Sequence, residues 1–117
     1  MVRTHKDLDV WKIAIDFVTT IYQITSLFPK EEIYGLTSQI RRVAVSIPSN
    51  IAEGAGRKSK TEFKQFLYIA LASASELETQ IIIANNLKYL QEDKYENMQK
   101  ELNTIAKMLQ GLIKSIS

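Results

Sequence analysis

The sequence predicts an all-α protein: an antiparallel up-down-up-down four-helix bundle that forms a single domain over residues 1–117. Three observations support this fold class. Apolar residues recur at helical spacing in four segments, short Pro- or Gly-containing connections separate them, and the last segment has a coiled-coil repeat. The chain has two Pro, four Gly, 45% hydrophobic and 24% charged residues. This composition favours helices and argues against disorder. A folded chain of this mass is expected to expose roughly 6,500 Å².

The first predicted helix runs from about Leu8 to Leu27 and has two apolar stripes about 120° apart. One stripe consists of Trp11, Ile15, Val18, Tyr22 and Thr25. The other contains Val10, Ile13, Phe17, Ile21, Ile24 and Phe28. A helix in an isolated bundle needs only one such stripe. We therefore predict that Val10, Ile13, Phe17, Ile21 and Ile24 form an oligomer interface.

The second predicted helix begins near Thr37, after Pro29 and a connection with one helical turn over residues 30–35. Pro48 lies inside it, so we expect a kink there, since an internal proline otherwise costs about 3 kcal/mol. Serine and asparagine side chains beside Pro48 can bond the carbonyls that a kink frees. The segment 54–56, Gly-Ala-Gly, is predicted to end this helix because glycine suits the left-handed residue after a helix.

The third predicted helix starts after Ser59 and ends near Asn86. Ser59 and Glu62 have the spacing of a capping box. The fourth follows a connection at residues 87–92, and its apolar residues alternate in steps of three and four. They are Tyr95, Met98, Leu102, Ile105, Leu109, Leu112 and Ile116. This seam predicts a helix that packs as in a coiled coil.

Several kinds of site are excluded or disfavoured. The chain has no cysteine, which excludes disulfides, thiolate zinc sites and a cysteine nucleophile. Its one histidine, His5, has no nearby partner in the sequence, and the Glu-x-x-His pairs of di-iron bundles are missing. The glycines at 54 and 56 lack the context of a phosphate loop. We predict a protein that is not an enzyme, with no catalytic residue, metal or cofactor. Without a long apolar run or a signal-peptide core, we expect no membrane partner and a cytoplasmic location.

Residues 35–59, GLTSQIRRVAVSIPSNIAEGAGRKS, resemble the signature of the four-helix-bundle proteins encoded in intervening sequences of 23S rRNA genes. Residues 8–11, 28–30 and 76–80 support the resemblance, which covers essentially the whole chain. It departs at Val43, where a small alanine is more usual. The family is similar to the accessory proteins of diversity-generating retroelements, which form pentameric barrels and bind nucleic acid and a reverse transcriptase. The resemblance implies a four-helix bundle and a homopentamer, with RNA, DNA, a reverse transcriptase or another protein as partner. It implies less about biochemical function, because most members have no established activity.

Basic residues are concentrated in the middle of the chain, although the net charge is only +2. Between Leu36 and Lys64 there are six basic and two acidic residues. The basic ones are predicted to bind phosphate: Arg41, Arg42, Arg57, Lys58, Lys60 and Lys64. The free N–H groups that follow Ser59 add partial positive charge, and a ring of copies would multiply it.

Two other interpretations of this segment stay open. Its polar residues can form a solvated face with a Glu53–Arg57 pair worth a few tenths of a kcal/mol. They can also be buried against a neighbouring subunit. As function we predict a non-enzymatic homo-oligomeric nucleic-acid or ribonucleoprotein accessory factor. The alternative is a protein–protein interaction scaffold that binds no nucleic acid. Binding that weakens steeply with salt would favour the first.

Overall fold

The computed structural model describes residues 4–116, and these residues form helices and connections without any strand. The four α-helices are α1 (Asp9–Thr25), α2 (Leu36–Ala55), α3 (Lys60–Asn86) and α4 (Glu92–Ile116). Two short 3-10 helices lie at His5–Asp7 and Lys30–Glu32. The predicted all-α class is confirmed, and each predicted helix boundary lies within about two residues of the observed one.

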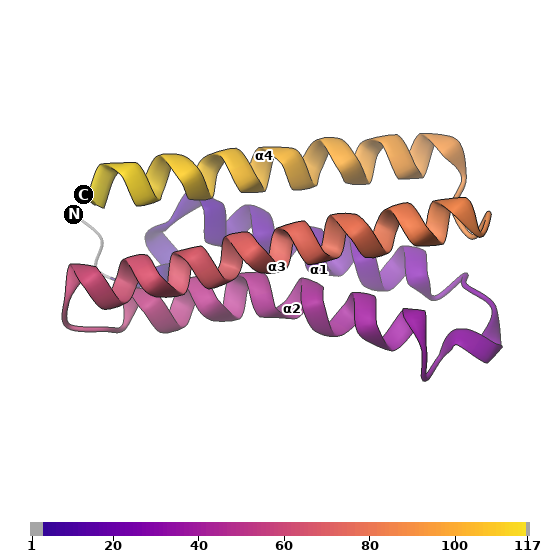
Figure 1. Cartoon of the computed structure of the whole chain (residues 1–117), viewed down its shortest axis with the longest axis horizontal. Coiled ribbons are helices and arrows are strands. Elements are labelled where there is room, and N and C mark those ends of the chain that lie inside the picture. The colour runs from indigo at the N-terminus through magenta and orange to yellow at the C-terminus, as the bar shows by residue number, and fades with distance from the viewer. Residues whose placement is uncertain (1–3, 117) are drawn as a thin grey trace.

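The helices form an elongated bundle of 43 × 24 × 19 Å. Successive helices run in opposite directions, and α2 packs on α1 and α3, while α4 packs on α3 and α1 (Figure 1). The α1–α2 and α3–α4 connections lie together at one end of the bundle. The α2–α3 turn lies at the other end, near both ends of the chain (Figure 1). The two ends of the bundle are therefore formed by different connections.

One apolar core runs through the bundle and takes residues from all four helices. Its largest fully buried side chains are Phe17, Ile21, Ile40, Ile47, Ile51, Leu67, Leu77, Ile81, Met98, Ile105 and Leu109. The α4 seam is buried as predicted from Met98 to Leu109, whereas Tyr95 at its start is half-buried. Beyond it, the fully buried position moves from Leu112 to Ile113. This shift agrees with the drift of an α-helix relative to a strict seven-residue repeat.

The prediction that the second α1 stripe contacts another subunit is wrong for three of its five residues. Val10, Phe17 and Ile21 are 4%, 1% and 0% exposed within the single chain. Ile13 and Ile24 are half-buried and pack against the same core. Because α1 contacts both α2 and α4, a wide apolar surface on this helix finds its partners inside the bundle.

The segment 54–56 ends α2 as predicted, but not through a glycine in the left-handed conformation. Gly56 has φ −83°, and no glycine among residues 4–116 has a positive φ. Gly54 lies inside α2 and is buried. A Cβ at this position would lie 2.7 Å from the Cβ of Phe66 and 3.0 Å from Cδ1 of Phe63. Gly54 therefore allows α2 and α3 to approach closely, which an alanine would prevent without displacement of α3.

Pro48 is buried inside α2, which continues through it from Leu36 to Ala55. Nearby side chains add hydrogen bonds to backbone carbonyls, but not to the Ala44 carbonyl that the missing Pro48 N–H leaves without its helical donor. The Ser46 hydroxyl donates to the Val43 carbonyl at 2.6 Å, and the Asn50 amide donates to the Ser46 carbonyl at 2.7 Å. The kink at Pro48 stays a prediction.

The outer surface of α3 is unusually apolar for a helix in a small bundle. Its exposed large apolar side chains are Tyr68, Ile69, Ile82 and Ile83. By length and composition alone α3 is apolar enough to cross a membrane. This is weak evidence, because the core helix of a soluble protein passes the same test, and Glu76 and Glu78 interrupt the apolar stretch. Thus α3, like α1 with its exposed Ile15 and Tyr22, has apolar residues outside the buried stripe.

Candidate nucleic-acid interface

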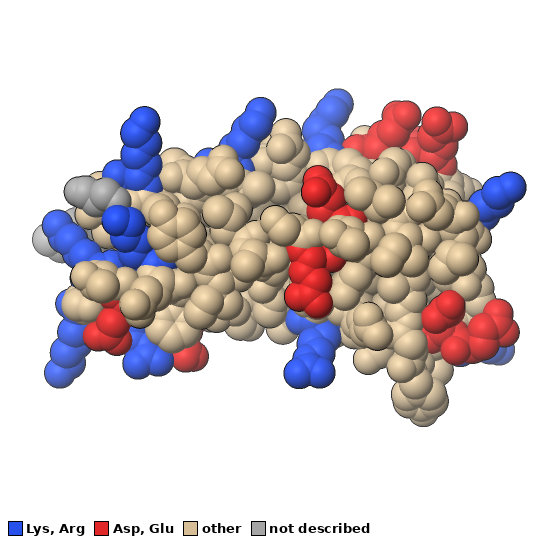
Figure 2. Space-filling view, in the orientation of Figure 1, with Lys and Arg blue, Asp and Glu red and all other residues tan. Residues whose placement is uncertain are grey.

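Basic side chains gather at the end of the bundle that carries the α2–α3 turn, and acidic ones gather at the opposite end (Figure 2). We call these the basic end and the acidic end. The basic end contains Lys6, Arg57, Lys58, Lys60, Lys64 and Lys114, which outnumber Asp7, Glu53 and Glu62 there. The acidic end contains Glu31, Glu32, Glu92, Asp93 and Glu96, which outnumber Lys30, Lys88 and Lys94 there. The small net charge of the chain hides this separation.

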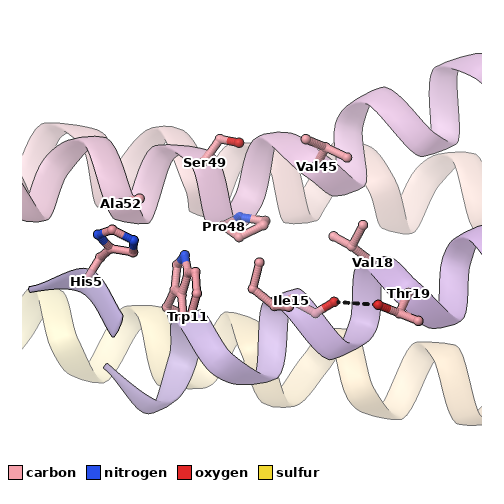
Figure 3. Close-up of a pocket in the computed structure, with 9 residues that line it drawn as sticks. All are labelled: His5, Trp11, Ile15, Val18, Thr19, Val45, Pro48, Ser49 and Ala52. Atoms are coloured by element: carbon pink, nitrogen blue, oxygen red, sulfur yellow. Dashed lines mark hydrogen bonds between the residues drawn. The ribbon is translucent and has the colours of Figure 1, made fainter. Parts of the chain in front are cut away.

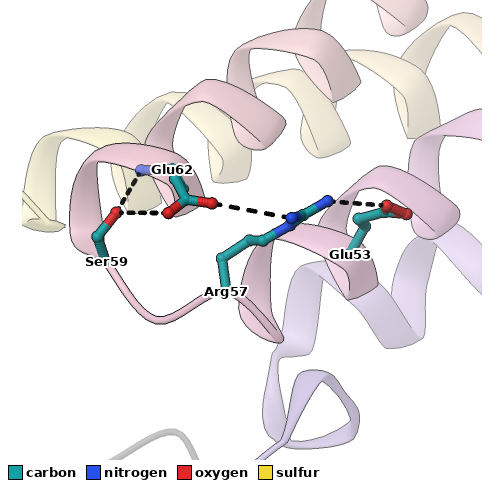
Figure 4. A network of polar contacts seen from close by, with 4 residues as sticks. All are labelled: Glu53, Arg57, Ser59 and Glu62. Carbon is teal, nitrogen blue, oxygen red and sulfur yellow. Dashed lines mark hydrogen bonds and ion pairs between the residues drawn. The ribbon is translucent and has the colours of Figure 1, made fainter.

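A small polar network fixes the α2–α3 turn (Figure 4). The Ser59 hydroxyl oxygen accepts a hydrogen bond from the Glu62 backbone N–H at 3.1 Å and caps α3, as predicted. Ser59 also donates to Oε1 of Glu62 at 3.3 Å. The Arg57 guanidinium lies 3.4 Å from the Glu53 carboxylate and 3.8 Å from the Glu62 carboxylate. It also lies 4.8 Å from the centre of the Phe66 ring. Arg57 therefore joins the end of α2 to the start of α3.

The three lysines of the turn remain available to a partner. Lys58 and Lys60 are exposed, and Lys64 is half-buried. None of the three forms an ion pair with another described residue. They lie beside the first turn of α3, whose free backbone N–H groups carry partial positive charge. Together they form the part of the predicted phosphate site whose basic side chains are not paired with a carboxylate.

The structure separates the two arginines of α2 from this cluster. Arg42 and Arg57 are fifteen residues apart on α2 and its extension, which is about 22 Å along a helix. Arg42 is exposed and faces the outer side between α2 and α3. The six predicted residues thus do not converge on one site.

Arg41 is held by α1. Its Nε donates to the Thr25 hydroxyl at 2.9 Å, and its Nη2 donates to the Tyr22 carbonyl at 3.4 Å. Its guanidinium also lies 4.6 Å from the centre of the Tyr22 ring. These contacts place a cation at the C-terminal end of α1, where the helix dipole favours it. Arg41 therefore stabilises the α1–α2 packing and is not a free phosphate ligand.

Two grooves run along the outside of α2. The first, of about 350 Å³, lies between α1 and α2 and is mainly apolar, with Trp11, Ile15, Val45 and Pro48 along it (Figure 3). The His5 ring meets Trp11 there edge to face, with centroids 5.0 Å apart. The other groove, of about 440 Å³, lies between α2 and α3 and is lined by both polar and apolar residues.

Sequence reasoning missed Gln80 in the second groove. Gln80 is buried, and its side-chain oxygen has no hydrogen-bond partner. It lies between Leu77 and Ile81 on the inner stripe of α3. A polar residue beside an apolar stripe was the available signal, but whether its oxygen finds a partner depends on the facing helix.

The acidic end holds a hydrogen bond between two connections. Tyr89 donates to Oε2 of Glu32 at 2.8 Å. This hydrogen bond, together with burial and the charges of Glu32 and Glu31, raises the pKa of Tyr89 above its ordinary value of 10.0. Glu32 also accepts from the Leu36 backbone N–H at 3.1 Å and so caps the start of α2. These groups serve the fold. Within residues 4–116, no group of three or more His, Asp or Glu side chains is placed to hold a metal ion.

Comparisons with known proteins agree with the architecture. The model of a family described as 23S rRNA-intervening sequence protein matches residues 6–111. A crystal structure from Bacteroides thetaiotaomicron, of a protein with unknown function from the S23 ribosomal protein family, is similar with a TM-score of 0.83 and 27% identity. The similarity covers 90% of this chain and 95% of that one. No curated protein matches the chain.

Proposed function

Because the chain belongs to the 23S rRNA-intervening sequence protein family, we propose that it is a non-enzymatic homo-oligomer that binds the phosphate backbone of RNA or DNA through its basic end. The observation that carries the proposal is the cluster of Lys58, Lys60 and Lys64. These lysines have no carboxylate partner among the described residues, whereas Arg57 beside them has two. Such point charges beside a helix N-terminus suit phosphate oxygens without reading base sequence.

The oligomeric part of the proposal, with a homopentamer as the expected form, rests on surface that a single bundle leaves exposed. The accessible surface is 7,338 Å², against about 6,500 Å² expected for a compact chain of this mass. The difference means that the chain is less compact than the average protein of its mass. The elongated shape contributes to it, and so do exposed apolar side chains.

Those exposed side chains form two different patches. Ile15, Tyr22 and Val45 lie along α1 and α2, while Ile69 and Ile83 lie on α3. Contact between two different patches is heterologous, and repeated heterologous contacts close into a ring when the rotation permits. These patches replace the core residues of α1 as the proposed subunit interface.

Charge reversal at the two ends tests the nucleic-acid part. The triple variant Lys58→Glu, Lys60→Glu, Lys64→Glu is compared with Lys30→Glu, Lys88→Glu, Lys94→Glu, which changes the net charge equally at the acidic end. We expect the first variant to bind a labelled single-stranded RNA at least tenfold more weakly in fluorescence anisotropy. Its salt dependence should also become shallower by about two in log–log slope, since each lost contact removes about 0.7. Equal losses in both variants would show that net charge, not the basic end, governs binding.

Light scattering tests the oligomeric part. Ile15→Asp and Ile69→Asp change exposed residues, so we expect each to lower the mass of the assembly while the helical circular dichroism is preserved. Gln110→Asp, an exposed position on α4, is the control. A monomeric wild-type protein at micromolar concentration would contradict the proposal. Salt-insensitive binding of one polypeptide, with no RNA binding, would instead support an interaction scaffold.

A further inference from the structure

The acidic end of the bundle exposes large apolar side chains that the chain itself does not cover. Tyr34 is 95% exposed and Leu27 is 84% exposed, more than any other large apolar side chain among residues 4–116. Ile33 and Leu87, at the same end, are about half exposed. The core and the subunit patches proposed above do not contain these four residues. Exposed apolar side chains that gather in one place are typical of a surface that binds another molecule.

These four side chains lie close together because the two connections of the acidic end are joined. Tyr89 of the α3–α4 connection donates a hydrogen bond to Glu32 and packs on Phe28, both in the α1–α2 connection. Each of the four exposed side chains is within two residues of one of these three. The bundle is only 24 × 19 Å across, so a single partner can contact all four.

Acidic residues surround this apolar surface and limit what can bind there. The five acidic residues of the acidic end outnumber its three lysines (Figure 2). RNA, DNA and anionic lipid headgroups would be repelled by the excess negative charge. The acidic end of a second copy would be repelled as well, since like charges that meet in an interface disfavour it. The surface instead favours a partner with positive charge.

The basic end of a second copy has a suitable charge but lacks the apolar groups. No large apolar side chain in the described ranges 4–11, 54–66 and 109–116, which form that end, is exposed. Such a contact would place charged groups against Tyr34 and Leu27. The partner that fits combines positive charge and large apolar side chains in one segment. This combination is found in polypeptides and not in nucleic acids.

Glu31 and Tyr34 supply a receptor for arginine at this surface. The N–H groups of Ile33 and Gly35 donate to the carbonyls three residues before them, so the 3-10 pattern continues past Glu32. In that pattern side chains three residues apart lie on the same side. Among the described residues, the Tyr34 ring has no aromatic or cationic contact, and the Glu31 carboxylate has no hydrogen bond or ion pair. An arginine can stack on the ring while its N–H groups bind the carboxylate.

The fold contains the same kind of contact at two other places. The guanidinium of Arg41 lies 4.6 Å from the centre of the Tyr22 ring, and that of Arg57 lies 4.8 Å from the centre of the Phe66 ring. Arg57 also pairs with two carboxylates. Arginine suits such stacked and paired contacts better than lysine, whose ammonium is compact and strongly hydrated. An arginine from a partner would complete the same arrangement at the acidic end.

We propose that the acidic end binds a polypeptide segment that carries arginine and large apolar side chains. The arginine binds Glu31 and stacks on Tyr34, and the apolar side chains cover Leu27 and Leu87. Exposed aromatic and apolar side chains of this kind supply most of the binding energy in protein interfaces. The inference does not rest on the proposed function, because the surface lies at the end opposite the basic end.

Three fluorescent peptides test the charge and the arginine. Each is a dodecamer in which leucine alternates with arginine, lysine or glutamate, and each is titrated into the full chain and followed by anisotropy. We expect the arginine peptide to bind about threefold more tightly than the lysine peptide and the glutamate peptide not to bind. NMR chemical shifts should place the arginine peptide on residues 27–34 and 87–89. Equal binding of the arginine and glutamate peptides would overturn the inference.

Paired substitutions test the location. Glu31→Gln with Tyr34→Ser removes both parts of the arginine receptor at exposed positions, and so leaves the core intact. Glu78→Gln with Tyr68→Ser makes the same two changes at exposed positions on α3 and is the matched control. We expect the first variant to bind the arginine peptide about tenfold more weakly and the second to bind it like the wild type. Equal losses in the two variants would overturn the inference.

Other occupants give different results. A lower mass of the Glu31→Gln, Tyr34→Ser variant in light scattering, without peptide binding by the wild type, would identify a contact between copies and overturn the inference. Cosedimentation with phosphatidylcholine vesicles that depends on Tyr34, again without peptide binding, would identify a membrane surface and overturn it too. Charge reversal of the three lysines at the basic end should leave peptide binding unchanged, and the Glu31→Gln, Tyr34→Ser variant should still bind RNA. The inference and the proposed function can therefore fail separately.

Discussion

Different contacts fix the connections at the two ends of the bundle. At the basic end, α2 and α3 approach closely at Gly54, and Ser59 and Arg57 close the turn. The neighbouring lysines are left unpaired. At the acidic end, longer connections are tied together by their own side chains, with Tyr89 bonded to Glu32 and packed on Phe28 at 5.4 Å between ring centroids. The basic end is thus closed by a helix contact and a small ionic network, whereas the acidic end joins its two connections through one tyrosine–glutamate hydrogen bond and an aromatic contact.

The largest expected effect comes from breaking the close approach at the basic end. Gly54→Ala places a Cβ 2.7 Å from that of Phe66, so α3 must move. We expect a loss of about 2–3 kcal/mol in the free energy of unfolding, measured by chemical denaturation.

Gly56→Ala is the matched control for that variant. Its added Cβ would meet only ordinary contacts, at 3.6 Å and 3.7 Å, and its φ suits any residue. We expect no loss and a gain of up to about 1 kcal/mol from the less flexible unfolded chain. Equal destabilisation by both substitutions would mean that the backbone freedom of the two glycines matters, rather than the contact of Gly54 with Phe66.

A smaller effect is expected at the acidic end, where Lys88 has φ 65°. Its N–H donates to the Asn85 carbonyl, and the Tyr89 N–H donates to the Ala84 carbonyl, which is a Schellman motif at the end of α3. Lys88→Gly should raise the free energy of unfolding by about 1 kcal/mol, because glycine adopts this conformation without a Cβ clash. An unchanged or lower midpoint in thermal unfolding would show that Lys88 is not strained.

The smallest effect at neutral pH is expected from Tyr89→Phe, and it should depend on pH. Because the pKa of Tyr89 is raised in the folded protein, the folded state holds the phenol proton more tightly than the unfolded chain does. The resulting stabilisation is complete below pH 10 and is lost as the pH rises beyond it. Wild-type protein should therefore lose its advantage in melting temperature over Tyr89→Phe above pH 10. A constant difference from pH 8 to pH 11 would contradict the role of this hydrogen bond.

Sequence reasoning predicted the features that depend on nearby residues. The periodicity of α4 and the cap at Ser59 are local, and the structure confirms both. It failed where the outcome depends on which helix lies opposite. The spacing of Phe17 and Ile21 defines a stripe but does not say whether α4 or another subunit covers it. Gly54 likewise has no local signature, since its reason is the position of Phe66 on α3.

The candidate site shows the same division between features set by nearby residues and features set by a facing helix. The basic residues were visible in the sequence, but their availability was not. Glu53 was predicted to pair with Arg57 because the two residues have helical spacing, and the structure contains this pair. The hydrogen bond from Arg41 to Thr25, in contrast, joins residues sixteen positions apart on two different helices. Of the six predicted residues, Arg41 and Arg57 are held by other side chains and Arg42 lies elsewhere on α2, which leaves Lys58, Lys60 and Lys64 as the basic cluster.

Lysine footprinting tests the central claim most directly, because it uses the unaltered protein. The chain is acetylated briefly with and without single-stranded RNA, and the modification of each lysine is measured by mass spectrometry. We predict that RNA protects Lys58, Lys60 and Lys64, and leaves Lys30, Lys88 and Lys94 as reactive as before. Protection spread equally over both ends, or confined to the acidic end, would contradict the account.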